Sequence, residues 1–216
     1  MGVKSKSQNE AHLPPTRERI RNVAEELYVL RGHAGFSFGD VAASVGTTRA
    51  NIHHHFGSKS QLMAELIEGF AADAQKRIKS IWADGPKNFS GRLLLQVQDL
   101  RRFYDRFNPN SGDRNVWSPL SRLRLDLPLL GDIALRGLQR VDAAYDSCLT
   151  RAVSDAIANA TLRPDTPIED VSRLLRVTLM SCGPITQDSG DFAEVERLFA
   201  ALGRTLEAAW GAKGVA

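Results

Sequence analysis

Apolar residues recur at helical spacing along almost the whole chain, and no alternating run of β-branched residues suggests a strand. Ile20, Ala24 and Leu27 form the first such stripe, and Gly32 follows it as a helix stop signal. Because the same periodicity continues to the C-terminal end, the sequence predicts an all-α protein.

The periodic segments predict about nine helices. We expect them at about 17–31 (with Thr16 as its N-cap), 38–45, 49–55, 58–82, 88–107, 119–126 and 129–160, from Pro167 to the Gly183-Pro184 pair, and from Asp191 onward. In terms of domains, we expect a flexible N-terminal arm over 1–15, a helix-turn-helix DNA-binding domain over 16–57, a connecting helix over 58–82, and a ligand-binding and dimerisation domain over 83–216.

Composition narrows the class of protein only a little. The net charge of +3 permits a nucleic-acid partner without demanding one. The two cysteines, Cys148 and Cys182, are too few for a disulfide framework or a zinc cluster, which fits a reducing cytoplasm. They are most simply small buried hydrophobic residues, although a redox-sensing pair stays open. Since the chain shows neither a secretion signal nor an apolar run of membrane-spanning length, we expect a cytoplasmic protein with no membrane partner.

The most informative segment is 37–56, where two short helices are joined by a turn that contains Gly46. This length and this glycine are typical of a helix-turn-helix. Thr48, Arg49 and Asn51 lie at the start of the second helix, where a recognition helix meets the edges of bases. Arginine can hold guanine and asparagine can hold adenine through paired hydrogen bonds, so these residue types fit that place. An alternative interpretation is that Arg49 is only a solvated surface charge.

The stretch from Thr16 to Phe70 resembles the DNA-binding domain of the TetR family, above all in GFSFGDVAASVGTTRANIHHHFGSKSQL. The residues that carry the resemblance are Phe56, Ser58, Lys59 and Leu62 near the helix-turn-helix, and Gly35, Asp40, Ala42 and Gly46 upstream. The resemblance covers about a quarter of the chain, and residues 71–216 match only in length and helical character.

The resemblance implies roles for individual residues. Ser37, Thr48 and Lys59 would contact phosphate, and Arg49 and Asn51 would face bases. His53 stands where the family usually has tyrosine, so the usual phosphate contact is in doubt there, and His54 occupies a position that often bears an aromatic residue or histidine. Three neighbouring helical residues point about 100° apart. His53, His54 and His55 therefore cannot converge on one ion, and we predict no metal site.

The resemblance further implies a ligand-responsive transcription regulator, which we expect to act as a repressor. A homodimer would bind a palindromic DNA operator, and an unidentified small-molecule effector would release it. Aromatic residues that are candidates for the effector cavity are Phe103, Tyr104, Phe107, Trp117 and Tyr145, each of which is also a plausible ordinary core residue.

The last two helices carry broad apolar stripes. In isolation such stripes usually form the core of one chain, but the resemblance implies that they pack against a second copy as a four-helix bundle. The predicted dimer contacts are Val171, Leu174, Leu175, Leu179, Val195, Leu198, Phe199, Leu202 and Leu206.

Two other classes of protein compete with this interpretation. An all-helical enzyme would need a nucleophile, base or metal set, and the chain has no HExxH, no GxSxG and no glycine-rich phosphate loop. We therefore predict no enzymatic activity and no cofactor. A DNA-binding or protein-interaction module without a ligand is the second alternative, and a cavity in the C-terminal part would argue against it.

Overall fold

The computed structural model describes residues 16–212, and the expected arm over 1–15 lies outside this range. The regular elements within 16–212 are ten α-helices and one π-helical turn, which confirms the predicted all-α class. They are α1 (Thr16–Arg31), α2 (Phe38–Val45), α3 (Arg49–Phe56), α4 (Lys59–Ile78), η1 (Lys79–Ala83), α5 (Phe89–Phe107), α6 (Pro119–Leu125), α7 (Leu127–Leu130), α8 (Asp132–Ala158), α9 (Ile168–Ser189) and α10 (Ala193–Trp210).

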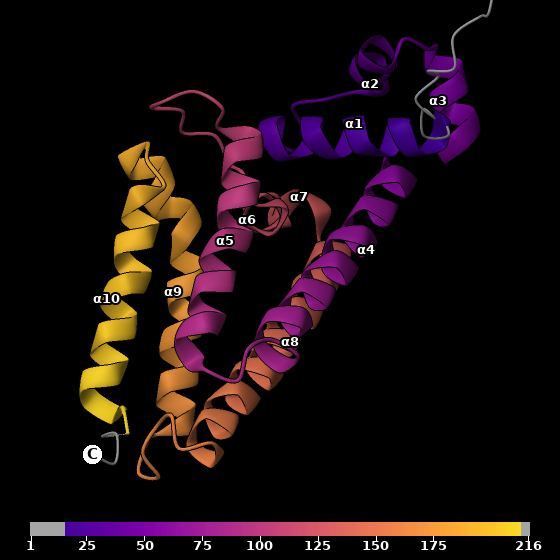
Figure 1. The fold of residues 1–216 in the computed structure, drawn as a ribbon. Helices are drawn as coiled ribbons and strands as arrows, with labels where there is room; N and C mark the ends of the chain where they lie inside the picture. The colour runs from indigo at the N-terminus through magenta and orange to yellow at the C-terminus, as the bar shows by residue number, and fades with distance from the viewer. Residues whose placement is uncertain (1–15, 213–216) are drawn as a thin grey trace, which may run out of the picture.

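Helices α1, α2 and α3 form a group at one end of the molecule, and α4 runs away from them into the remaining bundle (Figure 1). Their shared core consists of small and branched residues without exposure, among them Ile20, Ala24, Val41 and Ile52. Burial of each large apolar side chain of this kind stabilises the fold by about 1.5–3 kcal/mol. The shared core of the three helices therefore fixes the position of α3 and of its exposed side chains.

Helix α4 packs against α8 over much of its length, and α9 and α10 lie side by side next to α5 and α8 (Figure 1). Gly137 of α8 permits the close approach to α4, because a Cβ atom built on it would lie 2.8 Å from Cγ2 of Ile67. Trp82 closes the end of this core, with no exposure and with its Nε1 donating to Oε1 of Gln96 at 2.8 Å.

The prediction that Gly183 and Pro184 end a helix is wrong. Helix α9 continues through both residues to Ser189, and Gly190 ends it with a φ of 70°. Pro184 removes one hydrogen bond to the carbonyl of Met180. Pro184 and Met180 are both exposed, so water can reach that carbonyl. Gly183 instead serves packing, since a Cβ atom there would lie 3.0 Å from Oγ of Ser121 on α6.

The segment expected as one helix over 129–160 also differs. A separate single turn, α7, precedes α8, and Gly131 divides them with a φ of 57°. This division accounts for the tenth helix where the sequence predicts about nine. The remaining expected boundaries agree closely with α1 to α6.

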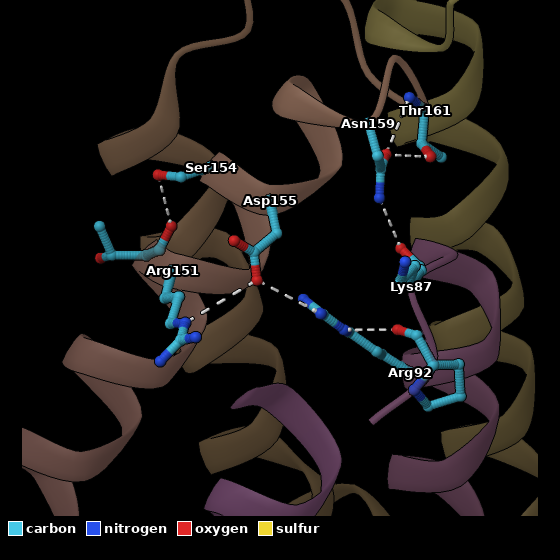
Figure 2. A network of polar contacts seen from close by, with 9 residues as sticks. Lys87, Arg92, Arg151, Ser154, Asp155, Asn159 and Thr161 are labelled. Atoms are coloured by element: carbon cyan, nitrogen blue, oxygen red, sulfur yellow. Dashed lines mark hydrogen bonds and ion pairs between the residues drawn. The ribbon is translucent and has the colours of Figure 1, made fainter. Parts of the chain in front are cut away.

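A polar network fastens the loop before α5 to the C-terminal part of α8 (Figure 2). Arg92 is 3% exposed, donates from Nε to the carbonyl of Pro86 at 2.8 Å, and places Nη2 3.5 Å from Oδ2 of Asp155. Asn159 adds a bond from Nδ2 to the carbonyl of Lys87 at 3.0 Å. The network therefore fixes the bundle at the end away from α1–α3. None of the helices within residues 16–212 has the length and apolar character of a membrane span.

Candidate nucleic-acid interface and core cavity

The turn between α2 and α3 is built by local hydrogen bonding. Ser37 caps α2, where its Oγ accepts from the amide of Asp40 at 3.3 Å and the Asp40 carboxylate accepts from the amide of Ser37 at 2.7 Å. Gly46 ends α2 with a φ of 74°, a left-handed conformation that favours glycine. Thr48 then caps α3 by accepting from the amide of Asn51 at 3.2 Å. The expected helix-turn-helix is therefore present.

Helix α3 buries one face and exposes the other. Ile52 and Phe56 pack into the core, whereas Thr48, Arg49, His53 and His54 are exposed. An exposed short helix that follows such a turn has the form of a recognition helix. Asn51 is half-buried, and its Nδ2 donates to Oγ1 of Thr47 at 2.9 Å. Arg49 and His54 are thus the freer polar groups on this face, while Asn51 is held against the turn.

His53 has a defined orientation. Its Nδ1 lies 2.9 Å from the carbonyl oxygen of Gly57, and its ring meets the Phe38 ring edge-on with centroids 4.8 Å apart. A carbonyl oxygen only accepts, so Nδ1 carries the hydrogen. In the neutral ring Nε2 is then an acceptor, and it becomes a donor to phosphate only when the ring is protonated.

Lys59 is engaged within the chain. Its Nζ donates to the carbonyls of His33 and Phe36, the latter at 2.5 Å, and lies 4.3 Å from the centroid of the Phe36 ring. Partial burial lowers the pKa of Lys59 below its ordinary value. A positive charge in the first turn of a helix opposes the helix dipole. The hydrogen bonds to these two carbonyls explain the presence of a lysine at this position, in addition to the expected phosphate contact.

The turn between α1 and α2 is also held from the other side by α6. Arg122 donates from Nε to the carbonyl of Val29 at 2.8 Å and from Nη2 to that of Leu30 at 3.0 Å. Asp126, at the end of α6, accepts from the amide of His33 at 2.7 Å. The C-terminal end of α1 is therefore bonded directly to the helical bundle.

A cavity of about 210 Å³ lies between α4, α5, α6 and α8, with α1 at its edge. Of the five aromatic residues expected there, Phe103, Trp117 and Tyr145 line it. The expectation is wrong for Tyr104 and Phe107, which do not line it. Both are buried, and the Tyr104 ring packs against that of Phe192 with centroids 5.2 Å apart. These two belong to the ordinary core.

The cavity also has polar walls that the sequence analysis missed. Arg77 places Nε 3.3 Å from Oδ2 of Asp99, and its guanidinium lies 4.4 Å from the centroid of the Phe103 ring. Gln96 and Asp99 are 2% and 6% exposed and line the same cavity. Each of these three residues reads as an ordinary surface position in a helical pattern. The position of Gln96 and Asp99 on adjacent turns of α5, beside Leu100 and Phe103, is a sequence signal that could have found these two, whereas no such signal marks Arg77 on α4.

Burial corrects the predicted dimer contacts. Five of the nine residues are 3% exposed or less and are covered by this chain's own helices, so their side chains are not available to a second copy. These are Val171, Leu175, Val195, Phe199 and Leu206. Leu179, Leu198 and Leu202 are half-buried against the same core, whereas Leu174 is 49% exposed. The exposed apolar residues of α9 that the sequence analysis missed are Val177 and Met180.

Both cysteines are unpaired thiols. Burial raises the pKa of Cys182 to about 12 and that of Cys148 above its ordinary value. Since the thiolate is the reactive form, neither site activates its sulfur.

Comparisons with known proteins agree with this geometry. The sequence profile of a family described as bacterial regulatory proteins, tetR family, matches residues 20–66. The transcriptional repressor KstR2 of Rhodococcus jostii is 29% identical over 69 residues, which make up 32% of this chain and 34% of that protein. The repressor NemR of Escherichia coli K12 is 23% identical over 143 residues, 62% of this chain and 72% of NemR. The chain thus spans about a third of KstR2's length in its match.

Solved structures extend the similarity of fold to the whole bundle. The reduced form of E. coli NemR superposes with a TM-score of 0.74 at 16% identity, covering 93% of this chain and 99% of that one. A TetR regulator from Chloroflexus aurantiacus gives 0.75 at 19% identity, covering 92% and 97%.

The exposed recognition helix on a three-helix platform defines a DNA-binding transcription regulator of the helix-turn-helix class. With the profile that matches residues 20–66, the related repressors and the shared fold, the chain is similar to transcription regulators of the TetR family.

Proposed function

We propose that this chain is a ligand-responsive repressor that binds a palindromic operator as a homodimer and is released by a small-molecule effector. The observation that carries the proposal is that one helix serves both ends of the molecule. Helix α4 begins at Lys59, which bonds to the turn of the DNA-binding group, and its residues Phe70, Ala74 and Ile78 line the cavity. A molecule in the cavity therefore touches the helix on which the DNA-binding group is mounted.

In this proposal the DNA contacts remain those expected from the sequence. Ser37 and Thr48 reach phosphate from the two helix starts, joined by Lys59 through its third hydrogen. Arg49 and Asn51 face bases, and the exposure of Arg49 supports its role more strongly than the half-buried Asn51 supports its own. His53 and His54 flank them on the exposed side of α3.

The proposed dimer uses the exposed face of α9. Leu174, Val177 and Met180 are 49%, 56% and 46% exposed and recur at helical spacing. An exposed apolar strip of this kind supports an interaction surface. A two-fold dimer would place two copies of α3 on half-sites about 34 Å apart, or a multiple of that distance.

The proposed mechanism is a two-state equilibrium. Without effector, the dimer holds both α3 helices at operator spacing. An effector prefers a state with different spacing, and the change passes through α4 and through α6. The first residues of α6, Pro119 and Leu120, line the cavity, and Arg122 of the same helix holds α1. Effector and DNA must then weaken each other's binding by the same factor. An effector that binds tightly and leaves operator affinity unchanged would contradict this mechanism.

In domain terms we propose that 16–57 binds DNA, 58–82 connects, and 83–216 binds the effector and dimerises. The protein would act in the cytoplasm and catalyse no reaction.

The test is fluorescence anisotropy with duplexes that cover the DNA flanking the gene, against a scrambled duplex of equal length. We expect specific binding by two chains per palindrome, weakened by salt because phosphate contacts release counterions. Equal binding of both duplexes would favour a DNA-binding module without sequence specificity. Loss of all binding at low salt would contradict the proposed function.

A further inference from the structure

The cavity offers hydrogen-bond donors and has few acceptors left. The Trp82 indole nitrogen can only donate, so its 2.8 Å bond to Gln96 fixes Oε1 of that amide as the acceptor. The amide nitrogen is then the free end of Gln96, and it has no hydrogen-bond partner within residues 16–212. A side chain that is 2% exposed and lines the cavity therefore presents two unsatisfied hydrogens there.

The Asp99 carboxylate beside it is already occupied. Oδ1 accepts from Nη2 of Arg102 at 2.8 Å, and Oδ2 lies 3.3 Å from Nε of Arg77. Both oxygens of this carboxylate therefore already face a guanidinium group, which leaves Asp99 little capacity to accept a hydrogen bond from a ligand. Arg77 approaches Asp99 most closely through Nε, and its two terminal nitrogens make no hydrogen bond in the described part of the chain.

Tyr145 supplies a further donor. It lines the same cavity from α8, and its hydroxyl has no hydrogen-bond partner among residues 16–212. Burial raises the pKa of Tyr145 to about 12, with Arg77 and Asp99 near enough to act on it. The hydroxyl therefore stays protonated near neutral pH.

The remaining walls are mostly apolar and include three aromatic rings. Phe70, Phe103 and Trp117 line the cavity, and the guanidinium of Arg77 is fixed over the Phe103 ring. An apolar cavity of about 150 Å³ is enough to hold benzene. The volume of about 210 Å³ leaves room for one ring and a small polar group.

Two acidic residues, Glu25 and Asp73, also border the cavity, and an unpaired carboxylate there would favour a cationic ligand. Glu25 is paired with Arg106 at 3.2 Å, and Asp73 is exposed. Neither leaves a buried carboxylate without a partner. The described donors therefore outweigh the acceptors inside the cavity.

We propose that the cavity binds a small aromatic carboxylate, whose ring packs against Phe103 and Trp117 and whose carboxylate accepts from Arg77, Gln96 and Tyr145. This inference rests on the proposed function, because it names the chemical class of the effector. Charge-assisted hydrogen bonds of this kind are about twice as strong as neutral ones, so the charge decides the selectivity.

Calorimetric titration of the full chain without DNA tests the proposal with three probes of nearly equal shape, namely benzoate, benzamide and benzamidine. We expect benzoate to bind at least tenfold more tightly than benzamide, and benzamidine most weakly. Equal affinities, a preference for benzamidine, or no detectable benzoate binding would overturn the proposal. Since no operator is present, these results do not depend on whether the chain binds DNA.

Variants locate the site. Arg77→Gln should reduce benzoate affinity about tenfold to a hundredfold and abolish the preference over benzamide. Arg102→Gln is the matched control, because it removes the other guanidinium on Asp99, is 75% exposed and does not line the cavity. Tyr145→Phe should lower the affinity for benzoate and leave the helical circular dichroism signal unchanged. This second variant keeps the test decisive if Arg77→Gln does not fold. Equal losses in the Arg77 and Arg102 variants, or an unchanged Tyr145→Phe, would overturn the assignment.

Discussion

Asp126 on α6 accepts a hydrogen bond at 2.7 Å from the main-chain nitrogen of His33, in the turn that ends α1. Gly32 beside it has a φ of 74°, and a Cβ atom there would lie 3.2 Å from Oδ2 of Asp126. Asp126 as a residue is 9% exposed, so the bond is made largely away from bulk water. This hydrogen bond joins the main chain of the DNA-binding group to a side chain of the helical bundle.

Asp126→Asn tests that contact. The amide keeps one oxygen acceptor but loses the charge, and hydrogen bonds to charged groups are the stronger kind. We expect the free energy of unfolding to fall by about 1 kcal/mol in urea titrations. Asp188→Asn is the control, an exposed aspartate whose carboxylate makes no ion pair within the described residues, and it should change stability by less than about 0.5 kcal/mol. Equal effects of the two substitutions would contradict the role given to Asp126.

Two glycine substitutions separate packing from helix propensity. Alanine in a helix interior is favoured over glycine by about 1 kcal/mol. At Gly69 of α4 a Cβ atom meets nothing within 4 Å, so Gly69→Ala should stabilise by up to that amount. At Gly137 it lies 2.8 Å from Ile67, and overpacking costs about 1–3 kcal/mol. Gly137→Ala should therefore be neutral or destabilising, and a gain equal to that of Gly69→Ala would show that the interface of α4 and α8 is loose.

His33 predicts a loss of stability in mild acid. Burial, followed by the charge of Lys59, lowers the pKa of His33 in the folded chain, against the opposing effect of Asp126. As the pH falls below about 6.5, the unfolded chain binds a proton that the folded chain does not yet bind, so unfolding becomes easier. The stabilisation present at neutral pH is therefore lost with acidification.

Urea midpoints measured between about pH 7.5 and 5 check this, with His33→Gln as the comparison. The variant should show the flatter profile. Ser37 holds the pKa of Asp40 below its usual range, so that carboxylate stays charged throughout the window. Parallel profiles for the two proteins would argue against His33 as the cause.

His53→Tyr tests whether a hydroxyl donor at this position serves phosphate better than histidine does. The Nδ1 hydrogen of His53 is directed at Gly57, so the neutral ring offers phosphate only the Nε2 acceptor, whereas a tyrosine hydroxyl can donate. His53→Tyr, which restores the residue expected from the resemblance, should therefore bind the operator more tightly in anisotropy titrations. Unchanged affinity would remove this role from His53.

The DNA-binding end of the molecule was readable from sequence because local rules determine it. Ser37, Gly46 and Thr48 act on their immediate neighbours, and each takes the expected place as cap or turn. Boundaries set by tertiary packing were not readable. Gly183 and Pro184 look like a helix end, yet the glycine admits α6 and the exposed proline leaves its orphan carbonyl accessible to water.

The cavity lining and the exposed apolar face of α9 were predicted less well, for one physical reason. A helical stripe shows that residues are apolar, but not whether the same chain covers them, so Leu175 and Leu174 look alike although they are 0% and 49% exposed. The converse holds for Gln96 and Asp99, which read as surface positions and are buried at the cavity. In both cases the burial of a residue depends on packing between helices that are distant in the sequence.

The most direct test of the account is the effect of Arg49→Ala on operator affinity, measured by anisotropy beside Arg151→Ala. Arg49 is exposed at the start of α3, whereas Arg151 is exposed at the far end of α8 (Figure 2). Both substitutions remove one positive charge. Loss of a base contact costs about 1–3 kcal/mol, so we expect roughly 5-fold to 150-fold weaker binding for Arg49→Ala and discrimination against the scrambled duplex to shrink. Unchanged affinity, or equal losses in the two variants, would contradict recognition through α3.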